Sequence, residues 1–80
     1  MKAYVLIQTG PTRMRQVAKA LRGKRIGKCK FVSAEAITGP YDVIVVCEGP
    51  SLEAIWQCVE KGCAKGGGVQ HTLTCLVVAD

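Results

Sequence analysis

The sequence predicts an α+β fold, in which two helices cover one face of a four-stranded antiparallel sheet. Short β-branched runs alternate with segments whose apolar residues recur at i, i+3, i+4 and i+7, and glycines and prolines separate the segments. The resulting order is strand, helix, strand, strand, helix, strand, which is the ferredoxin-like split βαβ arrangement. Its 80 residues, 1–80, are expected to form one domain.

The first third of the chain predicts a strand followed by an amphipathic helix. Ala3–Thr9 is short, rich in β-forming residues and stopped at once by a Gly-Pro pair. Over Thr12–Arg22 the apolar residues share one helical face, and Gly23 is expected to close that helix in a left-handed conformation. Gly23–Gly27 should then form a basic turn.

The middle of the chain predicts a hairpin. Lys28–Thr38 and Tyr41–Glu48 both have strand character, and the short Gly39-Pro40 turn between them favours antiparallel neighbours. Strict alternation along the first of these strands groups four residues on one face. These are Phe31, Ser33, Glu35 and Ile37.

The last third predicts a second helix and a final strand. Ser51 is a good N-cap, and the apolar stripe of the helix consists of Leu52, Ile55, Trp56, Val59 and Cys63. Gly66-Gly67-Gly68 should end the helix as a flexible connection. A phosphate cradle would need a helix after the glycines, whereas the strand Val69–Val78 follows them.

Right-handed crossovers place the first and third strands at the centre of the sheet. Both strands are apolar on both faces: Val5 with Ile7 and Ile44 with Val46 show this. Since the helices cover only one face, the second face is expected to meet a symmetric partner subunit.

Charge is distributed unevenly along the chain, with nine basic residues before the first acidic residue, Glu35. They are Lys2, Arg13, Arg15, Lys19, Arg22, Lys24, Arg25, Lys28 and Lys30. A basic segment of this kind is compatible with a nucleic-acid face, and equally with a solvated helix face or an acidic partner.

The five cysteines form no Cys-x-x-Cys pair, and four lie within apolar patterns. Reduced thiols packed as small hydrophobic side chains are therefore expected, with no cofactor and no metal site. The single histidine has no partner arranged for nucleophilic catalysis, and no two carboxylates are spaced for acid–base work, so an enzyme is not expected. Short apolar runs and the lack of a signal-peptide pattern indicate a cytoplasmic protein with no membrane segment.

Three motifs in register resemble the amino-acid-sensing C-terminal domain of the leucine- and asparagine-responsive (Lrp/AsnC) transcription regulators. They are Ala3-Tyr4-Val5-Leu6-Ile7, Thr38-Gly39-Pro40-Tyr41-Asp42 at the family's Gly-x-Tyr-Asp turn, and Gly68-Val69-Gln70-His71-Thr72-Leu73-Thr74 at its Gly-Val-x-x-Thr-x-Thr strand. The resemblance covers almost the whole chain. It departs from the family at Pro40, at the three consecutive glycines and in the cysteines, and it lacks the family's helix-turn-helix, which suggests a stand-alone form.

The resemblance implies a homodimer joined sheet to sheet, a higher ring-like oligomer, and a free amino acid or similar small molecule bound between subunits. It also implies possible hetero-assembly with full-length Lrp/AsnC regulators and no direct DNA binding. The ligand-binding residues carried over by position are Gly39, Tyr41, Asp42, His71, Thr72 and Thr74.

The residue types suit such a ligand, because a carboxylate can meet an ammonium group and hydroxyls can meet a carboxylate. They also have a purely structural interpretation, in which Asp42 bonds backbone near its turn and the threonines are ordinary strand residues. Two other functions remain open. One is a nucleic-acid-binding module of the same strand order, which lacks aromatic stacking platforms here; the other is a purely structural assembly domain.

Overall fold

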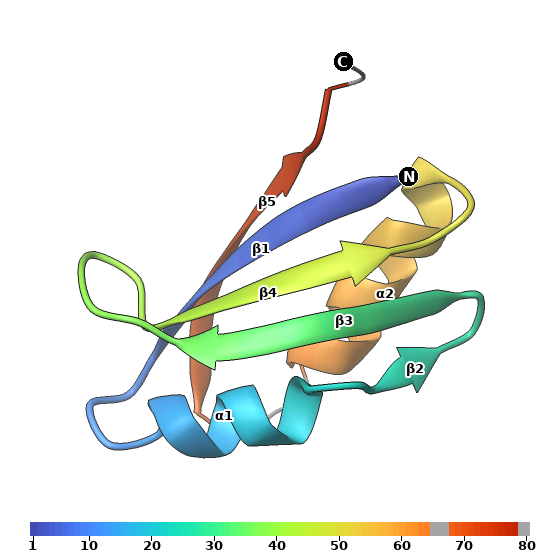
Figure 1. The fold of residues 1–80 in the computed structure, drawn as a ribbon. Helices are drawn as coiled ribbons and strands as arrows, with labels where there is room; N and C mark the ends of the chain where they lie inside the picture. The colour runs from blue at the N-terminus through green and yellow to red at the C-terminus, as the bar shows by residue number, and fades with distance from the viewer. Residues whose placement is uncertain (65–67, 79–80) are drawn as a thin grey trace.

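The computed structural model describes residues 1–64 and 68–78, which form a five-stranded antiparallel sheet and two helices (Figure 1). The elements are β1 (Lys2–Thr9), α1 (Met14–Leu21), β2 (Arg25–Ile26), β3 (Cys29–Ala36), β4 (Val43–Glu48), α2 (Leu52–Ala64) and β5 (Val69–Leu76). The strand order is β2-β3-β4-β1-β5. The antiparallel β3–β4 hairpin and the central position of β1 and β4 confirm the predicted topology.

The sheet has five strands rather than the predicted four, because the basic segment after α1 forms a short strand. Arg25 pairs with Lys30, and Ile26 pairs with Cys29. Gly27, at the turn between the two strands, has a φ of +59°, a left-handed conformation that glycine adopts without strain. Two residues are too few to show an alternation, so the sequence pattern indicated only a turn.

The predicted ends of the elements differ from the structure by a few residues. The first helix begins at Met14 rather than Thr12, and the last strand ends at Leu76 rather than Val78. Gly66 and Gly67 of the predicted connection lie outside the described residues. None of the helices in the described ranges combines the length and apolar character that crossing a bilayer demands.

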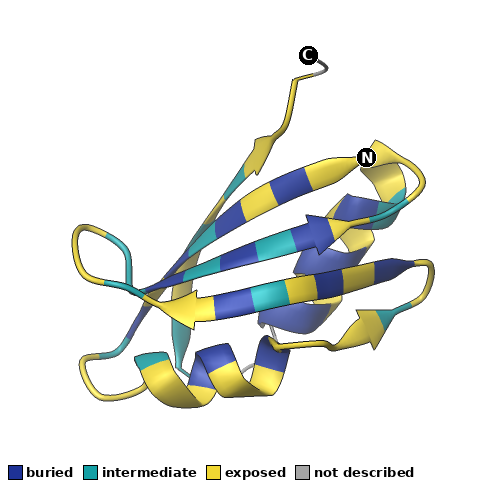
Figure 2. Ribbon diagram, viewed as in Figure 1, coloured by how far each residue is buried: buried dark blue, intermediate teal, exposed yellow. Residues whose placement is uncertain are grey.

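The core lies between the helices and one face of the sheet, as the alternating burial along the strands shows (Figure 2). From the strands it takes Ala3, Val5, Ile7, Cys29, Phe31, Ala34, Val43, Val45 and Cys47. From the helices it takes Val17, Ala18, Leu21, Ile55, Cys58, Val59 and Cys63. Both helices therefore cover the same face, as predicted.

The face assignment predicted for β3 is wrong because the strand contains a bulge. The register with β4 shifts between Phe31 and Ser33, leaving Val32 as the extra residue. Phe31 and Ala34 consequently share the buried face, whereas strict alternation had grouped Phe31 with Ser33. A bulge adds one residue without changing composition, so alternation alone could not detect it.

The second helix begins as predicted but is rotated relative to its predicted stripe. The Ala54 N–H donates to Ser51 Oγ over 3.2 Å, which is an N-cap bond. Cys58 is fully buried, whereas Leu52 and Trp56 are 50% and 56% exposed. Trp56 was predicted to lie in the core, and in the structure it lies on the surface.

The face of the sheet opposite the helices, the open face, carries partly exposed apolar side chains. Leu6 pairs with Ile44 on one side and Leu73 on the other, and Tyr4 pairs with Val46. The central strands are therefore apolar on both faces, as the sequence indicated.

Candidate functional site

The turn that carries the predicted ligand residues connects β3 to β4 at one end of the sheet. The Ile37 N–H donates to the Asp42 carbonyl oxygen over 2.8 Å and closes the loop. Gly39 has a φ of +126°, where a larger residue would be strained. Gly39 is exposed on the loop, and Tyr41 is half-buried.

Asp42 has a structural task. The backbone N–H of Thr9 donates to Asp42 Oδ2 over 2.9 Å, and the Asp42 N–H donates to the Ile7 carbonyl oxygen over 2.9 Å. These two bonds join the end of β1 to the start of β4. The Thr9 N–H donates to Oδ2, so the other carboxylate oxygen of Asp42, Oδ1, takes no part in this hydrogen bond.

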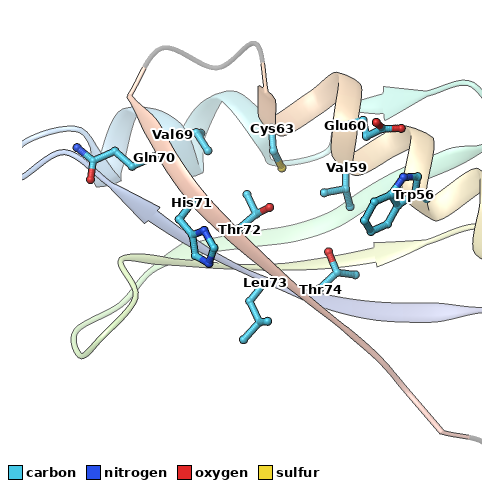
Figure 3. A pocket seen from close by; sticks show the side chains of 10 residues that line it. All are labelled: Trp56, Val59, Glu60, Cys63, Val69, Gln70, His71, Thr72, Leu73 and Thr74. Atoms are coloured by element: carbon cyan, nitrogen blue, oxygen red, sulfur yellow. The ribbon is translucent and has the colours of Figure 1, made fainter.

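The three predicted residues of β5 divide between the two faces of the sheet. Thr72 and Thr74 pair with Ile7 and Val5 and point toward α2, whereas His71 pairs with Gln8 (Figure 3). His71 is therefore on the side of the open face, next to the edge of the sheet. The alternation of side chains along β5 therefore separates the histidine from the threonines.

A groove of about 640 Å³ runs between α2 and the edge strand β5, and its lining includes residues from both faces of β5. Its apolar lining residues are Trp56, Val59, Cys63, Val69 and Leu73; its polar lining residues are Glu60, Gln70, His71, Thr72 and Thr74. On the strand side of the groove, the half-buried Thr72 and Thr74 lie on the face of β5 that points toward α2 (Figure 3).

The α2 side of this groove was not predicted from the sequence. Trp56 was expected to lie in the core but is exposed, whereas Val59 and Cys63 are core residues, as expected, and also border the groove. The sequence feature that could have indicated this side is Trp56. A tryptophan has a large apolar surface and is common at binding surfaces, and this one lies on the helix that precedes the proposed ligand strand. Only the packing of α2 over β5 shows which side of the helix faces the groove (Figure 3).

The structure does not bring all six predicted residues together within one chain. Thr72, Thr74 and His71 line the groove, whereas Gly39, Tyr41 and Asp42 do not. The loop and the start of β5 lie at the same end of the sheet, since Ile7 pairs with both Val43 and Thr72. Strand β1 lies between them.

Basic side chains gather at the opposite end of the sheet. A second groove, of about 560 Å³, is lined by Lys2, Arg25, Lys28 and Lys30 together with Glu48. Glu48 pairs in register with both Lys2 and Lys30, so one acidic side chain lies between two basic ones. Another predicted surface cation has a structural role: the Arg22 guanidinium donates to the Ala34 carbonyl oxygen from Nε and Nη2, over 3.1 and 2.8 Å.

All five cysteines are free thiols. Four of them are buried, as expected, whereas Cys75 is exposed and is not packed as predicted. Among the described residues, the group with the geometry to hold a metal ion consists of Cys29, Cys47 and Cys58. The spacing of these cysteines in the sequence did not predict the group, because the three residues come from three different elements.

No protein-family model and no curated protein matches this sequence. Solved structures do match. TTHA0845 from Thermus thermophilus is 24% identical with a TM-score of 0.86, over 99% of this chain and 94% of that one. AsnC of E. coli is 15% identical with a TM-score of 0.79, over 99% of this chain and 51% of that one. The transcriptional regulator NMB0573 of Neisseria meningitidis, solved with L-methionine, is 18% identical with a TM-score of 0.74, over 99% and 50%.

This chain spans about half the length of AsnC and of NMB0573. The agreement extends over all of its secondary structure, and it coincides with the family indicated independently by three sequence motifs. Regulators of the Lrp/AsnC family are thus among the structural neighbours of this chain, and its fold is that of an Lrp/AsnC-like domain.

Proposed function

We propose that this chain is an amino-acid-binding regulatory domain of the Lrp/AsnC type, which holds a free amino acid between subunits and thereby changes its own assembly. The observation that carries the proposal is the groove between α2 and β5. One wall is apolar, with Trp56 and Val59, and the facing strand presents the hydroxyls of Thr72 and Thr74. Pockets for small molecules combine these two features.

The polar groups match the two charges of a zwitterion. The threonine hydroxyls can donate hydrogen bonds to the carboxylate of the ligand, and a protein carboxylate can accept from its ammonium group. Glu60 supplies such a carboxylate at the groove itself. The apolar wall then receives the side chain of the ligand.

The polar residues of the loop enter through a second subunit in this proposal. Because Tyr41 and Asp42 lie outside the groove of their own chain, they can contribute only if a neighbouring copy brings its loop to that groove. A site completed by two chains couples ligand occupancy to assembly by thermodynamic linkage. A homodimer joined through the open face and a larger ring built from such dimers are parts of this proposal.

The comparisons support the same class of function. NMB0573 was solved as a complex with L-methionine, and it is a transcriptional regulator. We therefore propose that this chain also binds a small molecule and acts in regulation rather than in catalysis.

The test is a thermal-shift screen of the twenty common amino acids against the parent protein and two variants. Asp42→Asn keeps an oxygen that can accept from the Thr9 N–H while removing the charge, and Thr72→Val removes a hydroxyl from the groove. A ligand at about 100 times its dissociation constant adds about 2.7 kcal/mol to the stability of the parent. We expect a smaller shift in each variant.

A matched control is Thr12→Val, which removes an exposed hydroxyl outside the groove and should leave the ligand-induced shift unchanged. The proposal is wrong if no amino acid raises the melting temperature of the parent. It is equally wrong if Thr72→Val and Asp42→Asn respond to the ligand as the parent does.

A nucleic-acid-binding module is the second candidate, and the basic groove formed by Lys2, Arg25, Lys28 and Lys30 favours it. On the open face, however, Tyr4 is the aromatic side chain available for base stacking among the described residues, since Phe31 is buried under the helices. A short RNA that stabilises the protein in a strongly salt-dependent way, with no effect of any amino acid, would favour this candidate. If neither acts, the assembly-only interpretation gains support.

A further inference from the structure

Three cysteine side chains from three elements meet inside the core, away from the groove and the loop. Cys29 belongs to β3, Cys47 to β4 and Cys58 to α2, and each is 0% exposed. Their sulfur atoms all lie within 4.8 Å of one another. The sulfurs of Cys29 and Cys47 are 2.7 Å apart.

We propose that this thiol cluster, Cys29, Cys47 and Cys58, binds a soft monovalent metal ion, Cu(I). Sulfur ligands select soft or borderline metals over hard cations such as Mg²⁺ and Ca²⁺. A metal about 2.3 Å from each sulfur places the sulfurs about 3.8–4 Å apart. The 2.7 Å between Cys29 and Cys47 is shorter than that value, and no pair is more than 4.8 Å apart, so side-chain shifts of about 1 Å can bring the three sulfurs to one ion.

The number of ligands distinguishes Cu(I) from the other thiophilic metals. Structural zinc sites take four protein ligands, and iron–sulfur clusters are typically held by four cysteines. The group in the described part of the chain offers three ligands, all buried in an apolar core. Cu(I) is satisfied by two or three sulfur ligands and needs neither a fourth side chain nor a water molecule.

The surroundings of the cluster leave little space for a larger group. A methyl group added at Gly49 would lie 3.4 Å from Cys29 Cβ and 3.3 Å from an Ile55 side-chain carbon. A single ion that replaces thiol protons fits this tight packing, whereas a polynuclear cluster does not.

Binding exchanges protons for the ion and changes no oxidation state. Burial and the neighbouring thiols raise the pKa of Cys58 to about 12 and raise the pKa of Cys47 further, so these two thiols are protonated at neutral pH in the absence of a metal. One Cu⁺ and three thiols give a complex of two thiolates and one neutral thiol, with the release of two protons. The complex carries one negative charge, which limits the charge placed in the core.

An ion in this position would join α2 to the two strands beneath it. Because the site is assembled only in the folded chain, Cu(I) should stabilise the folded state by mass action. The remaining thiols are elsewhere: Cys63 lines the groove and Cys75 is exposed.

The test is an anaerobic titration in which the purified protein competes with bicinchoninate, a chromogenic ligand, for Cu(I). The variant with both Cys63→Ala and Cys75→Ala retains only the three thiols of the cluster, so it isolates the site without altering it. We expect parent and double variant to take up one Cu(I) per chain with equal affinity. Removing a residue that only supports a metal ligand lowers metal affinity by about 10- to 100-fold. Adding Cys58→Ser removes a ligand itself, so it should lower the Cu(I) affinity by more than that.

The proposal is overturned if the parent removes no copper from the competitor, or if the double variant loses binding that the parent shows. Zinc binding at one ion per chain in place of copper would overturn the assignment of a monovalent ion. If Cys58→Ser does not fold, X-ray absorption of the copper-loaded double variant decides. Two or three sulfur neighbours support the site, and nitrogen or oxygen neighbours overturn it.

Discussion

Glycine at position 62 lets α2 approach the sheet closely. A Cβ atom added there would lie 2.5 Å from Phe31 Cε2 and 2.9 Å from Ile26 Cδ1. Phe31 is fully buried and held in the core, so its ring cannot move away as an exposed side chain would. The close packing therefore depends on the absence of a side chain at one helical position.

We predict that Gly62→Ala destabilises the protein although alanine favours helices. The propensity gain is about 1 kcal/mol, and overpacking a rigid core costs about 1–3 kcal/mol. The contact distances are so short that the overpacking cost should exceed the gain, leaving a net loss of up to about 2 kcal/mol. Urea denaturation of the two proteins measures the difference.

The Phe31→Leu background provides the control for this prediction. Leucine removes the ring that the new methyl group would strike, so adding Gly62→Ala there should be neutral or stabilising. An equal loss of stability in both backgrounds would mean that the ring is not the cause.

At the scale of elements, buried thiols make the packing of α2 sensitive to alkaline pH. Burial raises the pKa of Cys63 from 9.0 to about 11, and burial with a neighbouring thiol raises that of Cys58 to about 12. Between the ordinary thiol pKa of 9.0 and these raised values, the unfolded chain has lost thiol protons that the folded chain still holds. The free energy of unfolding should therefore be highest below pH 9 and fall as the pH rises toward 11–12.

Urea denaturation under reducing conditions at about pH 8 and about pH 10.5 tests this, with Cys63→Ala as the comparison. Removing one of the buried thiols should make the decline less steep, whereas titration of lysines and tyrosines would affect both proteins equally. An identical decline in parent and variant would show that the Cys63 thiol contributes nothing to it.

Sequence periodicity predicted the major elements because each of them is long enough to repeat its pattern. It failed at Val32 and at Arg25–Ile26, where a bulge and a two-residue strand interrupt or shorten that pattern. The rotation of α2, which exposes Trp56, was also missed. The helix is apolar over more than one stripe, and tertiary contacts select which stripe is buried.

The candidate site was predictable only on its strand side. Thr72 and Thr74 occupy the faces that alternation assigns to them, while the α2 wall and the separation of Asp42 from the groove depend on packing. The thiol cluster was not predictable, since residues 29, 47 and 58 share no spacing rule and meet only after the sheet and α2 have formed.

At the scale of the whole molecule, the open face sets the expected state of assembly. Leu6 lies at its centre between Ile44 and Leu73, and leaving such a row in water is unfavourable. We predict a dimer or larger oligomer at micromolar concentration by light scattering, and a shift toward monomer for Leu6→Lys, because the new charge would be buried at the contact. Ala20→Lys adds the same charge at an exposed position on α1 and should leave the assembly unchanged. A parent protein that is folded and soluble at 8.6 kDa would exclude a partner on this face, and with it a ligand site shared between such partners.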